Sequence, residues 1–265
     1  MRNGAAVFFA VLIALGASWL GFVLTPTLQM GQAKLSKVLG STETYPIQRT
    51  GEATMGLQVY RANGCAACHT EQVGQEGVAF EVVMTSPGKN TNAVNKVLSG
   101  LKLTDLTKEE ADAANDQLSG AGAKVETHLS ATGGDISRGW GLRHSVAADF
   151  IYDSPVQLGS VRVGPDLADI GTRMADENAQ LVHLYEPKAI VNNSTMPSFK
   201  FLFEVRKIGE TPSADALKLP SQFAPASGFE VVPTPEAKQL AAYLLSLHAN
   251  VPLEEAPFSP ITAKK

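Results

Sequence analysis

Apolar residues follow one another without interruption near the N-terminal end of the chain. The run extends from Gly4 to Leu24, and Arg2 is the only charged residue before Thr25. A helix over this run is about 30 Å long, enough to cross the hydrocarbon core of a bilayer. The alternative is a cleaved signal peptide, whose apolar region usually covers about 7–15 residues and ends at a small-residue cleavage site. Because this run is longer and a polar Thr-Pro-Thr sequence follows it, we predict a retained transmembrane anchor over residues 1–24.

Helical spacing of apolar residues marks both ends of the remaining chain. Residues 25–49 are polar and interrupted by prolines, which predicts a stalk, and a helix is expected from about Thr50. Near the other end, Thr234-Pro235-Glu236 combines a capping residue, a first-turn proline and an acid at the positive end of a helix. We therefore predict a folded domain over residues 50–252 and a C-terminal tail over 253–265. Gly56 on the first helix would let it cross closely over Tyr243 on the last.

Residues 75–135 form a long segment between these helices. Thr107-Lys108-Glu109-Glu110 is a capping box. Apolar residues then recur every three or four positions, at Ala111, Ala114, Leu118, Ala121, Val125 and Leu129. This pattern predicts a helix with a narrow apolar seam, interrupted by two glycines, and residues 92–98 predict a shorter one. The segment is either a seam for docking a partner or an inserted hairpin packed on its own domain, and we favour the second.

Composition limits the possible functions. The chain has 265 residues, 44% of them hydrophobic, which suffices for one sizeable core. It carries 22 basic and 26 acidic residues, a formal net charge of −4. This balance excludes a nucleic-acid-binding class, which relies on clustered Lys and Arg.

The two cysteines carry the strongest chemical signal. They stand in Cys65-Ala66-Ala67-Cys68-His69, which is the C-x-x-C-H attachment signature of c-type haem. Each thiol would form a thioether with one haem vinyl group, and His69 would be the proximal iron ligand. A zinc site would need further ligands at matched spacing, and a redox dithiol would need a thioredoxin-like βαβ context. We predict one covalently bound haem c, with Cys65, Cys68 and His69 as its attachment and ligand residues.

A second axial ligand decides what the iron does. Met84, Met174 and Met196 are the candidate thioethers, and bis-histidine ligation is the alternative. We favour Met196 because it lies in an irregular loop and is followed by proline. A thioether ligand raises the reduction potential and suits electron transfer. Arginine and indole donors match haem carboxylates, so we also predict propionate partners in Arg138, Trp140, Arg143 and Arg162.

Gly164-Pro165-Asp166-Leu167 resembles the Gly-Pro-x-Leu string of class I cytochromes c. The resemblance implies that the Pro165 carbonyl accepts a hydrogen bond from the proximal histidine and that Leu167 packs on the haem. It also implies an all-α fold, with an N-terminal transmembrane helix followed by a class I cytochrome c-like domain with a helical insertion. Haem attachment in c-type cytochromes takes place outside the cytoplasmic membrane, so the body is expected in the periplasm.

Residues 138–203 resemble a narrower family. Arg-Gly-Trp-Gly at 138–141, Tyr-Asp-Ser-Pro at 152–155, the Gly-Pro-Asp-Leu string and His-Leu-Tyr-Glu-Pro at 183–187 precede Ser-Thr-Met-Pro-Ser-Phe at 194–199. This order resembles the membrane-anchored mono-haem subunit (subunit II) of cbb3-type cytochrome c oxidases. Residues 75–135 and 204–232 are longer than the corresponding connections of that family.

The resemblance implies His69/Met196 ligation and a single-pass protein of the bacterial inner membrane with a periplasmic haem domain. Its partners would be the lipid bilayer, an integral-membrane haem-copper catalytic subunit and another c-type cytochrome subunit. The chain would deliver electrons and contribute no bond-making chemistry of its own to oxygen reduction. The alternatives are a cytochrome subunit of a nitric oxide reductase, and a haem enzyme or gas sensor with an open distal site.

Overall fold

A computed structural model describes residues 3–30 and 34–258. The helices and strands are mostly short. The α-helices are α1 (Gly4–Trp19), α2 (Thr25–Met30), α3 (Gly51–Ala62), α4 (Thr91–Leu98), α5 (Lys108–Gly120), α6 (Gly134–Ser137), α7 (Ile170–Arg173), α8 (Glu177–Tyr185) and α9 (Pro235–Leu245). The strands are β1 (Ser36–Lys37), β2 (Thr44–Tyr45), β3 (Gly77–Ser86), β4 (Lys124–Thr132), β5 (Phe203–Lys207) and β6 (Phe229–Pro233). They pair in three antiparallel two-stranded sheets, β1–β2, β3–β4 and β5–β6.

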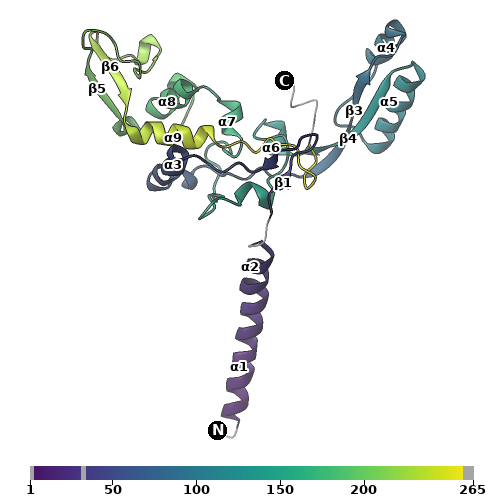
Figure 1. The fold of residues 1–265 in the computed structure, drawn as a ribbon, viewed down its shortest axis with the longest axis horizontal. Helices are drawn as coiled ribbons and strands as arrows, with labels where there is room; N and C mark the ends of the chain where they lie inside the picture. Colours follow the sequence, from purple (N-terminus) through teal and green to yellow (C-terminus); the bar gives the residue numbers. More distant parts are fainter. Residues whose placement is uncertain (1–2, 31–33, 259–265) are drawn as a thin grey trace.

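The N-terminal helix stands apart from the rest of the described chain (Figure 1). A π-helical segment, Leu20–Leu24, joins α1 to α2, so the helix continues past Leu24 to Met30. Thr25 and Thr27 donate their hydroxyl hydrogens to the carbonyls of Leu20 and Val23, at 2.8 and 2.7 Å. These bonds satisfy both hydroxyls inside the helix. The span Gly4–Gln29 is long and apolar enough to cross a bilayer, with none of its most apolar stretch buried, which is consistent with a single membrane anchor.

The crossing of α3 and α9 organises the body, which we define as residues 34–74 and 135–258. A Cβ atom on Gly56 would overlap the backbone oxygen of Gln239 and lie 2.7 Å from the Cβ of Tyr243, so only glycine allows this approach. The rings of Tyr60 and Tyr243 meet with their centroids 5.2 Å apart. The side chain of Thr234 caps α9 by accepting from the amide of Ala237. The two predicted helices and their close crossing are confirmed.

Residues 77–132 form a separate unit, which we call the inserted module. Strands β3 and β4 pair from Gly77 opposite Thr132 to Ser86 opposite Lys124. A short edge segment, residues 103–106, pairs with the other side of β3. Helices α4 and α5 pack on the resulting sheet around a core of their own: Val82, Val94, Leu106, Ala111, Ala114, Leu118 and Ala123. The module projects from the body on the side away from β5 and β6 (Figure 1).

The module corrects the prediction of an all-α protein with a helical insertion, because the chain is mostly helical but contains small sheets. The capping box and the helix near residues 92–98 are confirmed. The predicted long helix is wrong beyond Gly120, because Val125 and Leu129 lie on β4. Positions four apart share a face of a strand as well as of a helix, so this part of the spacing fits both structures. Residues 78–84 are apolar except for Glu81 and include three valines and a phenylalanine, and this short apolar run is a strand signal that the prediction missed.

Candidate functional site

One large cavity lies in the body next to the C-x-x-C-H segment. Its volume is about 460 Å³, within the range of about 300–1,000 Å³ that is usual for cofactor and ligand pockets. Its walls are mainly apolar and come from α3, α8, α9 and the loops near residues 164 and 195. Six residues predicted from the sequence line it: Cys65, Cys68, His69, Pro165, Leu167 and Met196.

The C-x-x-C-H segment is shaped by the residue before it. Gly64 has a left-handed backbone (φ +66°), which ends α3 and starts a 3-10 turn over Cys65–Ala67. The amides of Cys68 and His69 both donate to the carbonyl of Cys65, at 3.1 and 3.0 Å. Neither cysteine is in a disulfide, and burial raises the pKa of the Cys65 thiol to about 11. A thiol so resistant to ionisation does not suit a reactive redox dithiol.

The His69 ring is held from one side by the loop that carries Pro165. His69 Nδ1 lies 2.8 Å from the carbonyl oxygen of Pro165, the distance of a hydrogen bond. A Cβ atom on Gly164 would overlap the same ring, at 2.8 Å from Nδ1 and 2.9 Å from Nε2. Glycine at 164 is therefore required for the loop to reach the ring. With Nδ1 donating to Pro165, Nε2 keeps the lone pair that a metal ligand needs.

The structure brings two of the three candidate methionines and one histidine, His183, to the large cavity and leaves the third methionine outside it. Met196, Met174 and His183 all line the cavity, whereas Met84 packs against the core of the inserted module. His183 is only half exposed, and its buried Nδ1 has no hydrogen-bond partner among the described residues. Burial lowers the pKa of His183, and the nearby His69 lowers it further. An uncharged imidazole nitrogen without a partner beside an apolar cavity fits a bound group that completes its hydrogen bonding.

The predicted carboxylate partners lie elsewhere. Arg143, Arg162 and Trp140 are absent from the residues that line the large cavity. Arg143 is completely buried and forms a bidentate ion pair with Asp149 at 2.7 and 3.0 Å, while its Nε donates to the carbonyl of Val251. The guanidinium groups of Arg138 and Arg162 lie 5.1 and 5.5 Å from the ring of Trp140. The donors of Arg143 are thus occupied by Asp149, whose side chain is 6% exposed, and by the backbone of Val251.

Arg173 is the arginine that does line the cavity. It lies at the end of α7 and donates from Nη2 to the backbone carbonyl of Asp166. Burial lowers its pKa, although Asp169 and Asp166 oppose that shift. A guanidinium remains charged even so, and a charged donor in an apolar wall favours a carboxylate opposite it. No local sequence pattern marks Arg173 as a cavity residue, because only the packing of α7 beside α9 brings it to the cavity.

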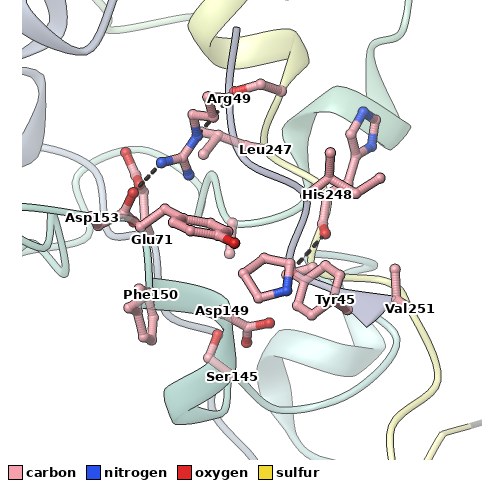
Figure 2. Close-up of a pocket in the computed structure, with 16 residues that line it drawn as sticks. Tyr45, Arg49, Glu71, Ser145, Asp149, Phe150, Asp153, Leu247, His248 and Val251 are labelled. Carbon is pink, nitrogen blue, oxygen red and sulfur yellow. Dashed lines mark hydrogen bonds and ion pairs between the residues drawn. The ribbon is translucent and has the colours of Figure 1, made fainter. Parts of the chain in front are cut away.

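A smaller cavity of about 140 Å³ lies between residues 45–49 and the rest of the body (Figure 2). Arg49 points toward Asp153 and forms an ion pair with it, and Tyr45 donates to the backbone oxygen of His248 at 3.0 Å. Glu71 also lines this cavity and accepts the hydroxyl of Tyr243 at 2.8 and 2.9 Å. Burial raises the pKa of Glu71 to about 8. Through these contacts, Tyr45 and Arg49 pack against the rest of the body.

A C-x-x-C-H segment facing a methionine across a cofactor-sized cavity is the arrangement of a mono-haem cytochrome. Residues 135–223 match the family model described as "Cytochrome C oxidase, mono-heme subunit/FixO". This match covers 89 of the 265 residues, so the chain is similar to the FixO family over about a third of its length. The matched residues include Pro165, Leu167 and Met196, and the resemblance seen in residues 138–203 is thereby confirmed. No match was found among curated proteins.

The description of that family names one haem and a cytochrome c oxidase, a complex that transfers electrons. The inserted module, residues 77–132, lies outside the matched segment. The family match therefore covers one wall of the large cavity and leaves the C-x-x-C-H wall to be interpreted from its own chemistry.

Proposed function

We propose that the large cavity holds one haem c, bound through thioethers to Cys65 and Cys68 and ligated by His69 and Met196. The observation that carries the proposal is the convergence of all four residues on one cavity of about 460 Å³. The hydrogen bond from His69 Nδ1 to Pro165 supports His69 as a ligand, since it fixes the tautomer that leaves Nε2 free. Haem iron supplies a reversible one-electron couple when it is bound.

The protein's own residues tune that couple and limit access to it. The carbonyl of Pro165 increases the donor strength of His69, while the thioether of Met196 favours the reduced state. Buried leucines, among them Leu167, Leu184 and Leu240, form apolar walls that exclude water. Arg173 and His183 stand in the same walls with polar nitrogens, and we assign them to the haem carboxylates in place of Arg143, Arg162 and Trp140.

We infer that the chain passes electrons to the membrane-embedded haem-copper subunit of the oxidase, from the periplasmic side of the inner membrane. Two features support this role. The match of residues 135–223 to mono-haem oxidase subunits supports a place in an oxidase complex. The apolar helix Gly4–Gln29 would confine the body to the membrane surface. Confinement keeps the haem within electron-transfer reach of a partner that also spans the bilayer.

A ligand-replacement series tests the site. Met196→Ala should lose the low-spin methionine-ligated spectrum, lower the reduction potential and allow carbon monoxide to bind the reduced protein. Met174 lines the same cavity, so Met174→Ala serves as the matched control. Its absorption spectrum and reduction potential should stay close to wild type. Retention of the wild-type spectrum and potential by Met196→Ala, with their loss in His183→Leu, would assign the sixth bond to His183 instead.

Purification from native membranes tests the function. The full-length protein should carry covalent haem and purify in mild detergent with a multi-spanning haem-copper subunit. Membranes that lack it should lose cytochrome c-dependent oxygen consumption. Purification with a nitric oxide-reducing subunit, and intact oxygen consumption without the chain, would contradict the role in the oxidase.

A further inference from the structure

Three charged side chains form a cluster beneath the segment that follows His69. Asp135 and Asp166 are buried, at 5% and 0% exposure, and the side chain of Arg162 is 35% exposed. Arg162 Nη1 lies 2.8 Å from Asp135 Oδ1, and its Nη2 lies 3.7 Å from Asp166 Oδ2. None of the three lines the large cavity. Any effect of the cluster on the cavity is therefore transmitted through the backbone.

Asp166 joins the two segments that carry His69 and Pro165. Its Oδ2 accepts the hydroxyl of Thr70 at 2.5 Å and the amide of Gln72 at 2.8 Å. Its Oδ1 accepts the amide of Ala168 at 2.8 Å. Asp166 directly follows Pro165, and Thr70 directly follows His69. The buried carboxylate of Asp166 thus links the residue after His69 to the residue after Pro165. Since the His69 ring meets the Pro165 carbonyl, this link fixes the distance between the two segments.

Arg162 extends this connection to the start of the inserted segment. Its Nε donates to Thr70 Oγ1 at 2.9 Å and its Nη2 to the carbonyl of Gln72 at 2.6 Å. Asp135, paired with Nη1, accepts the amide of Gly74 through its other oxygen at 2.7 Å. All three guanidinium nitrogens are occupied within residues 70–74 and 135. A planar guanidinium that donates from all three nitrogens holds the chain in a more defined geometry than a single charge could.

We propose that Arg162, Asp135 and Asp166 are positioning residues for His69: they hold the Pro165 carbonyl on the imidazole and thereby set the potential of the iron. This inference rests on the proposed function, in which His69 is the proximal ligand. The Nδ1–H bond to a carbonyl makes an imidazole a stronger donor, which stabilises ferric iron and lowers the reduction potential. Loosening the cluster weakens that bond, so the potential rises.

The charges of the cluster would act differently if they influenced the iron only through space. Removing the positive Arg162 would favour the ferric state and lower the potential, and removing the negative Asp166 would raise it. Positioning predicts an upward shift for both changes. The sign obtained with Arg162 variants therefore separates the two explanations.

The experiment is a redox titration of full-length protein purified from native membranes. Arg162→Gln and Asp166→Asn should both raise the potential, by about tenfold in the ferric-to-ferrous equilibrium or about 59 mV. Arg162→Lys keeps the charge but loses the fork, so it should shift the potential in the same direction. Arg206→Gln is the matched control, because it removes an arginine from buried Glu230 on β5–β6 (Nε–Oε1 2.9 Å) outside the cavity. It should leave the potential unchanged.

A downward shift in Arg162→Gln with no shift in Arg162→Lys would overturn positioning in favour of through-space charge. Potentials equal to that of the Arg206→Gln control in all three cluster variants would overturn it as well. If Arg162→Gln does not accumulate, Arg162→Lys alone still decides, because only positioning predicts a shift there. Wild-type protein without covalent haem would instead overturn the proposed function, a result visible before any variant is compared.

Discussion

The inserted module and the body fill their interiors in different ways. The module closes a small core with side chains alone, and Val82, Val94, Ala111 and Leu118 within it are completely buried. The body leaves a cavity of about 460 Å³ between α3, α8 and α9. Protein interiors are close-packed, so a space of this size belongs to a bound group and not to the resting packing of the chain. The comparison teaches that side chains alone fill the interior of the module, whereas the interior of the body leaves room for the haem proposed above.

Removing haem tests this difference most strongly. Without a bound group, the mainly apolar walls of the cavity of about 460 Å³ lose their packing partner, which destabilises the helices that form them. We expect full-length protein made without haem to lose protection from hydrogen exchange in α9 while β3 and α5 remain protected. Mass-spectrometric hydrogen exchange on the haem-free and haem-loaded proteins measures both regions at once. Equal protection of α9 in the two forms would contradict the comparison.

Methionines placed in the two regions give the next largest contrast. Met84→Ala should destabilise the inserted module by about 2 kcal/mol, as the loss of a partly buried side chain does, without changing the absorption spectrum. Met196→Ala should change the spectrum and the potential. Thermal unfolding and redox titration of the two variants separate the effects. A changed spectrum in Met84→Ala would mean that the module and the haem site are coupled.

Glycines on two helices should respond with opposite signs to the same substitution. Gly56→Ala places a methyl group against the backbone of α9, at a cost of about 1–3 kcal/mol or more. Gly120→Ala, in the last turn of α5, meets no atom within 4 Å and should stabilise the module by about 0.5–1 kcal/mol. Urea unfolding followed by circular dichroism gives both values. A stabilising Gly56→Ala would show that α3 and α9 can separate freely.

The smallest effect is expected at the cap of α5. The hydroxyl oxygen of Thr107 accepts a hydrogen bond from the amide of Glu110 at 3.2 Å. In return, the carboxylate of Glu110 accepts one from the amide of Thr107 at 2.8 Å. Thr107→Ala should cost about 1 kcal/mol, confined to the module. Hydrogen exchange should rise in the first turn of α5 and stay constant in α9. An equal rise in both helices would show that the two regions unfold as one unit.

Local signals determined much of what the sequence could predict. The helix starts at Thr50, Thr107 and Thr234 depend on residues within one turn, and the structure has them there. Likewise, C-x-x-C-H, Gly164-Pro165 and the loop of Met196 are local patterns, and the structure brings them to one cavity. The strand β4 was missed because apolar positions four apart fit either period, and only pairing with β3 decides between them.

Tertiary structure decided which charged groups belong to the site. The sequence does not distinguish among three arginines, Arg143, Arg162 and Arg173, because any guanidinium can bind a carboxylate. Packing assigns Arg143 to Asp149 and Arg162 to Asp135, and leaves Arg173 at the cavity wall. A long, flexible side chain takes the partner that the fold brings nearest and buries most completely. The sequence by itself therefore determined the C-x-x-C-H segment with His69 and the helices α3 and α9. The three-dimensional arrangement decided which charged side chains lie at the large cavity.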